Sequence, residues 1–115
     1  MNLKEFYEAV GGNYDDTVTR LMNESIVKKF VTLFTDDKSY NDFLNDFNNE
    51  KYEDAFRDIH TLKGLSLNLG FDTLSNICIT VTDALRDGKM EVTSDMLSKL
   101  ESAYNMTCEN IKKLD

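Results

Sequence analysis

Apolar residues recur at spacings of three and four along nearly the whole chain, and no segment alternates apolar and polar residues for long. This spacing is typical of α-helices that bury one face. The chain contains no proline, the residue that most strongly interrupts a helix. The pattern therefore predicts an all-α protein.

The first half of the chain predicts short helical segments separated by polar or glycine-containing breaks. Their apolar positions fall within about 3–10, 14–21, 26–34 and 40–47. The breaks lie at 11–13, at 36–37 and at 48–49. Asn13 belongs to a residue type that caps helix N-termini. The first two segments are too short to be stable alone.

The second half predicts three longer helices at about 52–69, 72–87 and 94–114, the first two ended by Gly70 and Gly88. Asp72 and either Thr93 or Ser94 are suitable N-caps. Short connections force consecutive helices to run antiparallel. We therefore expect an antiparallel up-and-down four-helix bundle with additional short N-terminal helices, formed as one domain over residues 1–115.

Composition and charge argue against several classes of function. The chain has 115 residues, of which 41% are hydrophobic and 30% charged, and its formal net charge of -8 opposes binding to nucleic acid. No apolar run approaches the roughly 20 residues of a membrane span. The start Met1–Glu5 lacks the pattern of a signal peptide. We expect a cytoplasmic protein without nucleic-acid or membrane partners.

The two cysteines predict no disulfide and no metal site. Cys78 and Cys108 lie far apart in sequence, and each falls on an apolar helical stripe. The chain contains no CxxC pair, and a single histidine is available to complete a metal site. Both cysteines are therefore predicted to be buried free thiols.

The only histidine, His60, lies in the stretch HTLKGLSLNLG at 60–70. On a helical wheel with about 100° per residue, the core stripe is Ala55, Ile59, Leu62, Ser66 and Leu69, and His60 points away from it. The residues around His60 on that wheel are Phe56, Arg57, Lys63, Gly64 and Leu67. This patch combines two cations, two large apolar groups and one position without a side chain.

Each member of this patch has a structural and a functional interpretation. A lone helical histidine is most often a surface residue. Gly64 costs a helix interior roughly 1 kcal/mol relative to alanine, so it serves either close helix packing or access to His60. The wheel favours access, because Gly64 projects toward His60. Lys63 and Arg57 could stabilise a phosphoryl group through charge-assisted hydrogen bonds. Phe56 and Leu67 could be covered by a partner or by a neighbouring helix.

The motif His60-x-x-Lys63-Gly64, followed by a small residue and by Gly70 at the end of the helix, resembles the signature of the histidine phosphotransfer (HPt) domains of bacterial multistep phosphorelays. The preceding Tyr52-x-x-Ala-Phe pattern extends the resemblance. Ile59 stands where many relatives have alanine, and Leu67 is larger than the small residue that is frequent there. The resemblance implies that His60 is phosphorylated, that Lys63 holds the phosphoryl oxygens and that Gly64 admits the partner.

The resemblance also implies the partners. These are response-regulator receiver domains and hybrid sensor kinases, with Mg²⁺ carried by the receiver and no cofactor or metal bound by this chain. We expect a phosphoryl carrier without kinase activity of its own, because Thr61 replaces the acidic residue that follows the histidine in sensor-kinase dimerisation helices. The alternative is an HPt-like interaction module that carries no phosphate. A monomer is expected, although Ile79, off the apolar stripe of its helix, could mark a contact.

Overall fold

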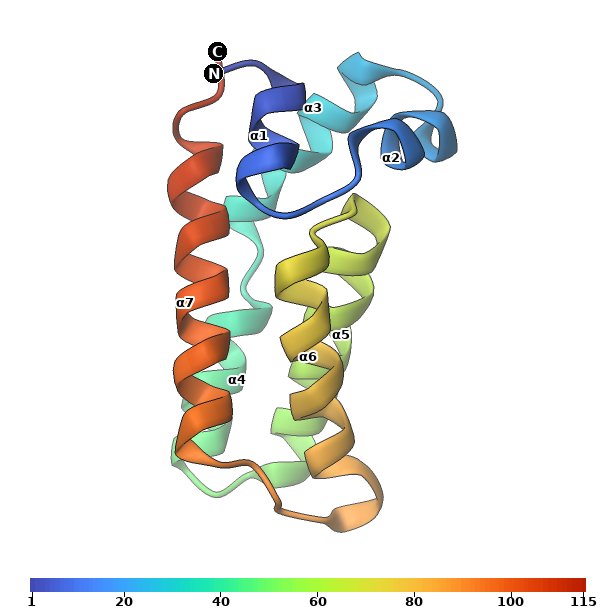
Figure 1. Cartoon of the computed structure of the whole chain (residues 1–115). Coiled ribbons are helices and arrows are strands. Elements are labelled where there is room, and N and C mark those ends of the chain that lie inside the picture. Colours follow the sequence, from blue (N-terminus) through green and yellow to red (C-terminus); the bar gives the residue numbers. More distant parts are fainter.

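The computed structural model describes all residues, 1–115, and is entirely helical, as the sequence predicts (Figure 1). The helices are α1 (Leu3–Ala9), α2 (Tyr14–Leu21), α3 (Glu24–Leu33), α4 (Ser39–Asn48), α5 (Tyr52–Leu69), α6 (Asp72–Leu85) and α7 (Ser94–Ile111). Two 3₁₀ turns, η1 (Phe34–Asp36) and η2 (Arg86–Gly88), follow α3 and α6.

Polar side chains fix where four of these helices begin. The side chains of Asn2, Asn13, Asn23 and Thr93 each accept a hydrogen bond from a backbone N–H in the first turn of α1, α2, α3 and α7. Glu5 completes a capping box with Asn2. The predicted caps at Asn13 and Thr93 are confirmed. Asp72, by contrast, is already the first residue of α6, whose N-cap is Phe71.

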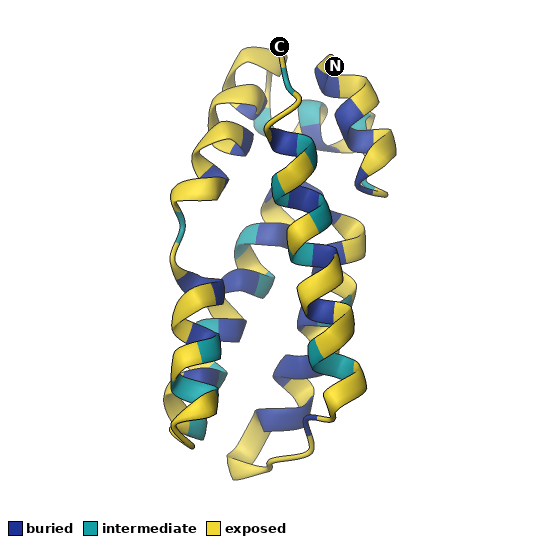
Figure 2. Cartoon of the chain, turned by 90° about the vertical axis from the view of Figure 1, so that its left-hand side faces the viewer, coloured by how far each residue is buried: buried dark blue, intermediate teal, exposed yellow.

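Helices α4 to α7 form the predicted antiparallel up-and-down bundle, and α5 packs against both α4 and α6 (Figure 1). On the other two sides of the bundle, α6 packs against α7, and α4 meets α7. The rings of Tyr40 on α4 and Tyr104 on α7 stack there with their centroids 4.1 Å apart. Dark buried residues line the inner face of each helix (Figure 2). The 23 buried residues that belong to the hydrophobic core form one cluster.

The short N-terminal helices close the end of the bundle at which both termini lie (Figure 1). The side chains of Phe6 and Tyr7 on α1 are fully buried, and the Phe6 ring meets that of Phe71 edge to face. The turn between α1 and α2 lies directly on the turn between α5 and α6. A Cβ on Gly12 would collide with the carbonyl oxygen of Gly70, so the two backbones can meet only at glycine.

The ends of two helices differ from the prediction. α6 ends at Leu85 rather than near 87, because Asp87 takes a left-handed conformation with φ of 57° and Glu91 N–H donates to the Ala84 carbonyl. α7 ends at Ile111 rather than at 114. The last residues turn toward the N-terminus, where the Met1 ammonium pairs with Asp115 at 3.0 Å. A local backbone turn thus ends α6, whereas contacts between the two chain ends accompany the early end of α7.

Both cysteines are free thiols, as predicted, but their burial differs. Cys78 is fully buried in the core. Cys108, predicted to be buried, is only half-buried, because it packs against the core cluster from outside and does not lie within it. Burial raises the pKa of both thiols. None of the helices combines the length and apolar character that crossing a bilayer requires.

Candidate functional site

Helix α5 presents two chemically different faces. The five residues of the predicted core stripe are all buried: Ala55, Ile59, Leu62, Ser66 and Leu69. Gly70 ends the helix in a left-handed conformation with φ of 74°, as its position in the sequence predicts. The opposite face is turned to solvent and carries His60. Packing between α4 and α6 therefore fixes the direction in which the histidine points.

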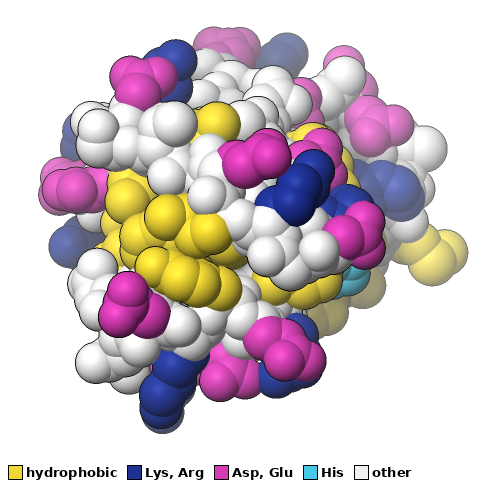
Figure 3. Space-filling view, turned by 90° about the horizontal axis from the view of Figure 1, so that it is seen from below, with side chains coloured by type: hydrophobic (Ala, Val, Ile, Leu, Met, Phe, Trp, Pro, Cys, Tyr) yellow, Lys and Arg dark blue, Asp and Glu magenta, His cyan; other side chains and the backbone are white.

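The imidazole of His60 is exposed and makes no hydrogen bond or ion pair within the protein. The half-buried ring of Phe56, one turn earlier, lies beside it, with 6.0 Å between the ring centroids. The histidine is visible at the right-hand side of the view along the bundle, beside apolar side chains (Figure 3). Both ring nitrogens are therefore free to react with a group brought by a partner.

The two predicted cations are not equivalent. The guanidinium of Arg57 pairs with Asp54 at 2.6 Å and with Glu53 at 3.3 Å, so its charge is shared with two carboxylates toward the start of α5. Lys63 has no carboxylate within ion-pair distance and donates no side-chain hydrogen bond. Lys63 is thus the cation on this face whose donors are free for an incoming anion.

Gly64 has open space where its side chain would be. A Cβ built on Gly64 would meet no atom of the protein within 4 Å. This finding removes the interpretation in which the glycine serves close packing of helices inside the chain. A glycine retained in the middle of an 18-residue helix, beside the only histidine, leaves the imidazole accessible from that side.

Arg86 is a third cation beside the site and was missed by the sequence analysis. It lies in η2, and its guanidinium carbon is 5.7 Å from the centre of the Phe56 ring. The same guanidinium pairs with Asp83 at 3.1 Å. Phe56 therefore contacts both His60 and Arg86, and it also lines a cavity of about 290 Å³ between the start of α5 and η2. No sequence spacing relates residues 56 and 86, so only the antiparallel packing of α5 and α6 reveals this contact.

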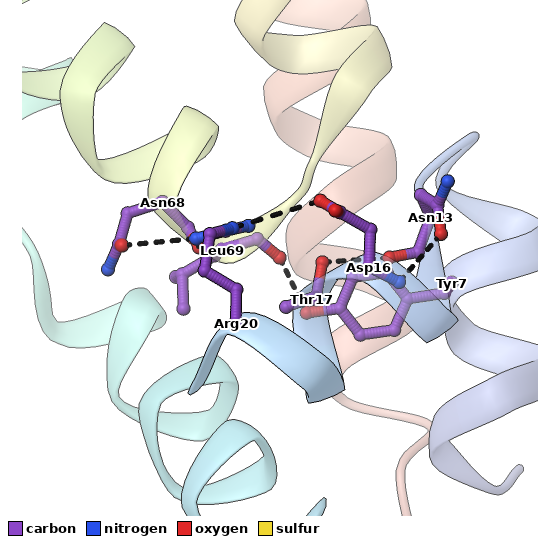
Figure 4. Close-up of polar contacts among 7 residues, drawn as sticks. All are labelled: Tyr7, Asn13, Asp16, Thr17, Arg20, Asn68 and Leu69. Atoms are coloured by element: carbon purple, nitrogen blue, oxygen red, sulfur yellow. Dashed lines mark hydrogen bonds and ion pairs between the residues drawn. The ribbon is translucent and has the colours of Figure 1, made fainter. Parts of the chain in front are cut away.

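Of the predicted docking residues, Leu67 is exposed on the same face of α5, whereas Phe56 is partly covered by its neighbours. Ile79 on α6 is also exposed. The end of α5 is held by the N-terminal helices (Figure 4). The Tyr7 hydroxyl donates to the Leu69 carbonyl at 2.5 Å, and Arg20 donates to the Asn68 carbonyl at 2.7 Å. These bonds satisfy carbonyls of the last turn, which a helix leaves without partners.

A group of carboxylates lies on another face of α5, toward α4. Asp58 Oδ2 is buried without a hydrogen-bond partner. Burial first, and then the neighbouring carboxylates of Asp46, Asp42 and Asp54, raise the pKa of Asp58 to about 7. Asp58 is two residues before His60 and hence faces away from it on the helix. No group of three or more His, Cys, Asp or Glu residues is arranged to hold a metal ion.

An exposed imidazole beside a free lysine on a rigid helix can accept and return a phosphoryl group, and a family comparison agrees with that chemistry. The family model of the Hpt domain matches residues 26–110. The chain belongs to the Hpt domain family. This Hpt domain is accordingly a phosphotransfer module of the kind used in phosphorelays. The resemblance seen in the sequence motif is thereby confirmed.

Two curated relatives are chemotaxis proteins CheA. The Hpt domain is 47% identical over 55 residues to CheA of Bacillus subtilis (strain 168) and 37% identical over 65 residues to CheA of Borreliella burgdorferi. These matches cover 45% and 54% of this chain and 8% of each relative. The chain thus spans a small fraction of the length of these relatives. No solved structure matches it.

Proposed function

We propose that this Hpt domain carries a phosphoryl group on His60 between aspartates of partner proteins. The single observation that carries the proposal is the exposed His60 imidazole, free of internal hydrogen bonds, beside the unpaired Lys63 and the open position at Gly64. A histidine kept for structure would be expected to pack or to form hydrogen bonds inside the protein.

The reaction requires little from the carrier beyond position and charge. A neutral ring nitrogen of His60 attacks the phosphorus of an aspartyl phosphate with its lone pair. The N–P bond forms as the bond from phosphorus to the aspartyl oxygen breaks, and the carboxylate leaves with the electron pair. Return of the phosphoryl group to a second aspartate reverses these bond changes. Lys63 would bind the phosphoryl oxygens in both directions.

The proposed partners are receiver domains and hybrid sensor kinases, which approach the exposed face of α5. Phe56, Gly64 and Leu67 would contact the receiver, and Arg57 would add positive charge despite its ion pairs. The receiver would supply Mg²⁺, while this domain would bind no cofactor. The domain would not phosphorylate itself from ATP, because Thr61, and not a carboxylate, follows the histidine. We further propose that the domain acts as a monomer in the cytoplasm.

The test is transfer of labelled phosphate from a phosphorylated receiver, compared with labelling by phosphoramidate, a small donor that needs no docking surface. We expect acid-labile label on the parent protein and none on His60→Gln. Because residue 60 is exposed, the variant should retain the helical content and cooperative unfolding of the parent. Label at the parent level on folded His60→Gln would refute the assignment. Absence of label on the parent with both donors would favour an interaction module that carries no phosphate.

A further inference from the structure

Phe56 contacts both the histidine of α5 and a cation at the end of α6. Its ring is tilted by 39° against the His60 ring, with 6.0 Å between the centroids. The guanidinium carbon of Arg86 lies 5.7 Å from the centre of the same ring. Aromatic pairs and cation–π contacts attract at these distances. The three side chains therefore form a continuous series of contacts from η2 to the reactive imidazole.

No hydrogen bond fixes the orientation of the His60 ring. Its nitrogens have no partner within the protein, and the next turn of the helix offers only the bare backbone of Gly64. An exposed side chain without such partners is free to change between staggered rotamers. The Phe56 ring, one turn earlier, is half-buried and thus less free. Its contact with the imidazole restricts the directions in which His60 points.

The Phe56 ring itself has space into which it could turn. It lines the hollow of about 290 Å³ at the start of α5, whose other lining residues are Tyr52, Glu53, Leu85, Asp87, Gly88 and Lys89. A cavity of about 150 Å³ already accommodates benzene, so the hollow has room for the ring. Arg86 contacts the ring but does not line the hollow. Its contact therefore favours the ring position beside His60 over one turned into the hollow.

Arg86 is held from its own end of the bundle. Its guanidinium donates a hydrogen bond to Asp83, one turn earlier, at 3.1 Å, and makes no hydrogen bond or ion pair to α5. Phe56 and Arg86 lie at similar distances in sequence from the turn between α5 and α6. The antiparallel packing of these helices thus places them at the same level of the bundle. Arg86 is accordingly linked to the reactive side of α5 through an aromatic ring.

We propose that Arg86 is a positioning residue for phosphoryl transfer, which holds the His60 imidazole through the Phe56 ring in orientations that can attack phosphorus. This inference rests on the proposed function of His60. Lys63 and Arg86 then differ in their tasks, because Lys63 binds the phosphoryl oxygens whereas Arg86 acts before the phosphoryl group arrives. A cation–π contact at an exposed site changes the balance between two ring positions by about two- to fivefold.

The test follows labelling by phosphoramidate, because this donor needs no docking surface and does not register the loss of receiver contacts. In Arg86→Gln we expect the initial rate of labelling to fall about two- to fivefold. Arg86 is exposed, so this variant should fold like the parent. Phe56→Leu should slow labelling at least as much. Adding Arg86→Gln to Phe56→Leu should have no further effect, because the ring through which Arg86 acts is then absent.

Nuclear magnetic resonance gives a second measurement, because the only histidine of the chain contributes a single pair of imidazole C–H signals. The ring current of Phe56 displaces these signals. Arg86→Gln should therefore move them toward their positions in Phe56→Leu. Lys99→Gln is the matched control, since Lys99 is also an exposed cation paired with a carboxylate at 3.1 Å, that of Asp95 on α7. It should change neither the labelling rate nor the signals of His60.

Three results would overturn the role of Arg86 and leave the proposed function intact. Losses that multiply in the double variant would show that Arg86 acts without Phe56, by direct contact with the phosphoryl group. Unchanged labelling of folded Arg86→Gln would show that it has no part in the reaction, and unchanged His60 signals would show that it does not position the imidazole. Failure of phosphoramidate to label the parent would instead reject the proposed function, and the role of Arg86 with it.

Discussion

At the scale of single residues, the exposed face of α5 is suited to a partner because several of its positions make no hydrogen bond or ion pair within the protein. His60 forms no internal hydrogen bond, Lys63 forms no ion pair, and Gly64 leaves open space. Arg57 differs from Lys63 because two carboxylates already bind it. These differences are visible in side-chain geometry alone and lead to two predictions.

Substitutions of Gly64 distinguish its effect on access to His60 from its effect on the stability of the protein. Gly64→Ala should raise the free energy of unfolding by up to about 1 kcal/mol, because alanine is the better helix former and the added methyl meets nothing within 4 Å. Gly64→Gln should also fold normally, but its long side chain would stand beside the imidazole. We expect transfer from a receiver to fall steeply in Gly64→Gln, while labelling by phosphoramidate persists. Thermal unfolding and both labelling assays on the two variants provide the measurement. Lower stability in both variants with retained transfer would contradict the access interpretation.

Lys63 and Arg57 form a matched pair of cations on one face. Lys63→Ala should slow transfer by about tenfold, since a hydrogen bond to a charged group is worth about 1.5 to 3 kcal/mol before solvent screening. Arg57→Ala should have a smaller effect, because its guanidinium is already bound to Glu53 and Asp54. Transfer rates at low and high salt would measure the difference. Equal effects of the two substitutions would show that the internal ion pairs do not withhold Arg57 from the phosphoryl group.

At the scale of elements, the contact of α4 with α5 contains an unfavourable charge. Asp58 on α5 has a buried oxygen without a partner, and its pKa is raised to about 7 by burial and by the carboxylates of Asp46, Asp42 and Asp54. A group whose pKa is raised on folding stabilises the folded state most when it is protonated, below its unfolded pKa of about 4. That contribution is lost as the pH rises toward 7. The helix contact should therefore weaken over this range.

Asp58→Asn tests this conclusion. The variant should be more stable than the parent at pH 8, by about 1 kcal/mol once solvent screening at the partly exposed site is allowed for, because the amide carries no charge. The gain should shrink as the pH falls from 7 and disappear near pH 4. Denaturant unfolding across this range measures it. Asp36→Asn, at an exposed carboxylate without an ion pair, is the control and should show no such dependence. A gain that grows toward low pH would have the wrong sign.

At the scale of the whole molecule, α1 belongs to the same core as the bundle and α2 packs against that core, although the family match begins at residue 26. The buried Phe6 ring packs against Phe71 at the α5–α6 turn. Gly12 meets Gly70 at the same place, and Tyr7 binds the end of α5. The N-terminal helices therefore support the helix that carries His60.

Phe6→Ala should lower the free energy of unfolding by about 3 to 5 kcal/mol, the usual cost of removing a buried aromatic ring. Phe30→Ala removes the same ring from an exposed position and should cost far less. Denaturant unfolding followed by circular dichroism would compare the two variants. One cooperative transition with a lower midpoint in Phe6→Ala is expected. An unchanged transition would show that α1 does not stabilise the bundle.

The sequence by itself determined the helices, the face of α5 that bears His60 and the family to which the chain belongs. These features depend on local periods and caps, such as Asn13, Thr93 and Gly70, whose effects act within a turn of the residue concerned. The ion pairs of Arg57 are equally local, because Glu53 and Asp54 precede it by four and three residues, and the sequence analysis could have found them.

Only the tertiary structure decided which distant residues meet. The position of Arg86 over Phe56 depends on the packing of α6 along α5, and the contact of Gly12 with Gly70 depends on how α1 closes the bundle. The exposure of Ile26 could not be predicted either, since buried Val27 and exposed Ile26 are both apolar and adjacent in sequence. Periodicity shows that a helix has apolar positions, whereas the neighbouring elements decide which of them are covered.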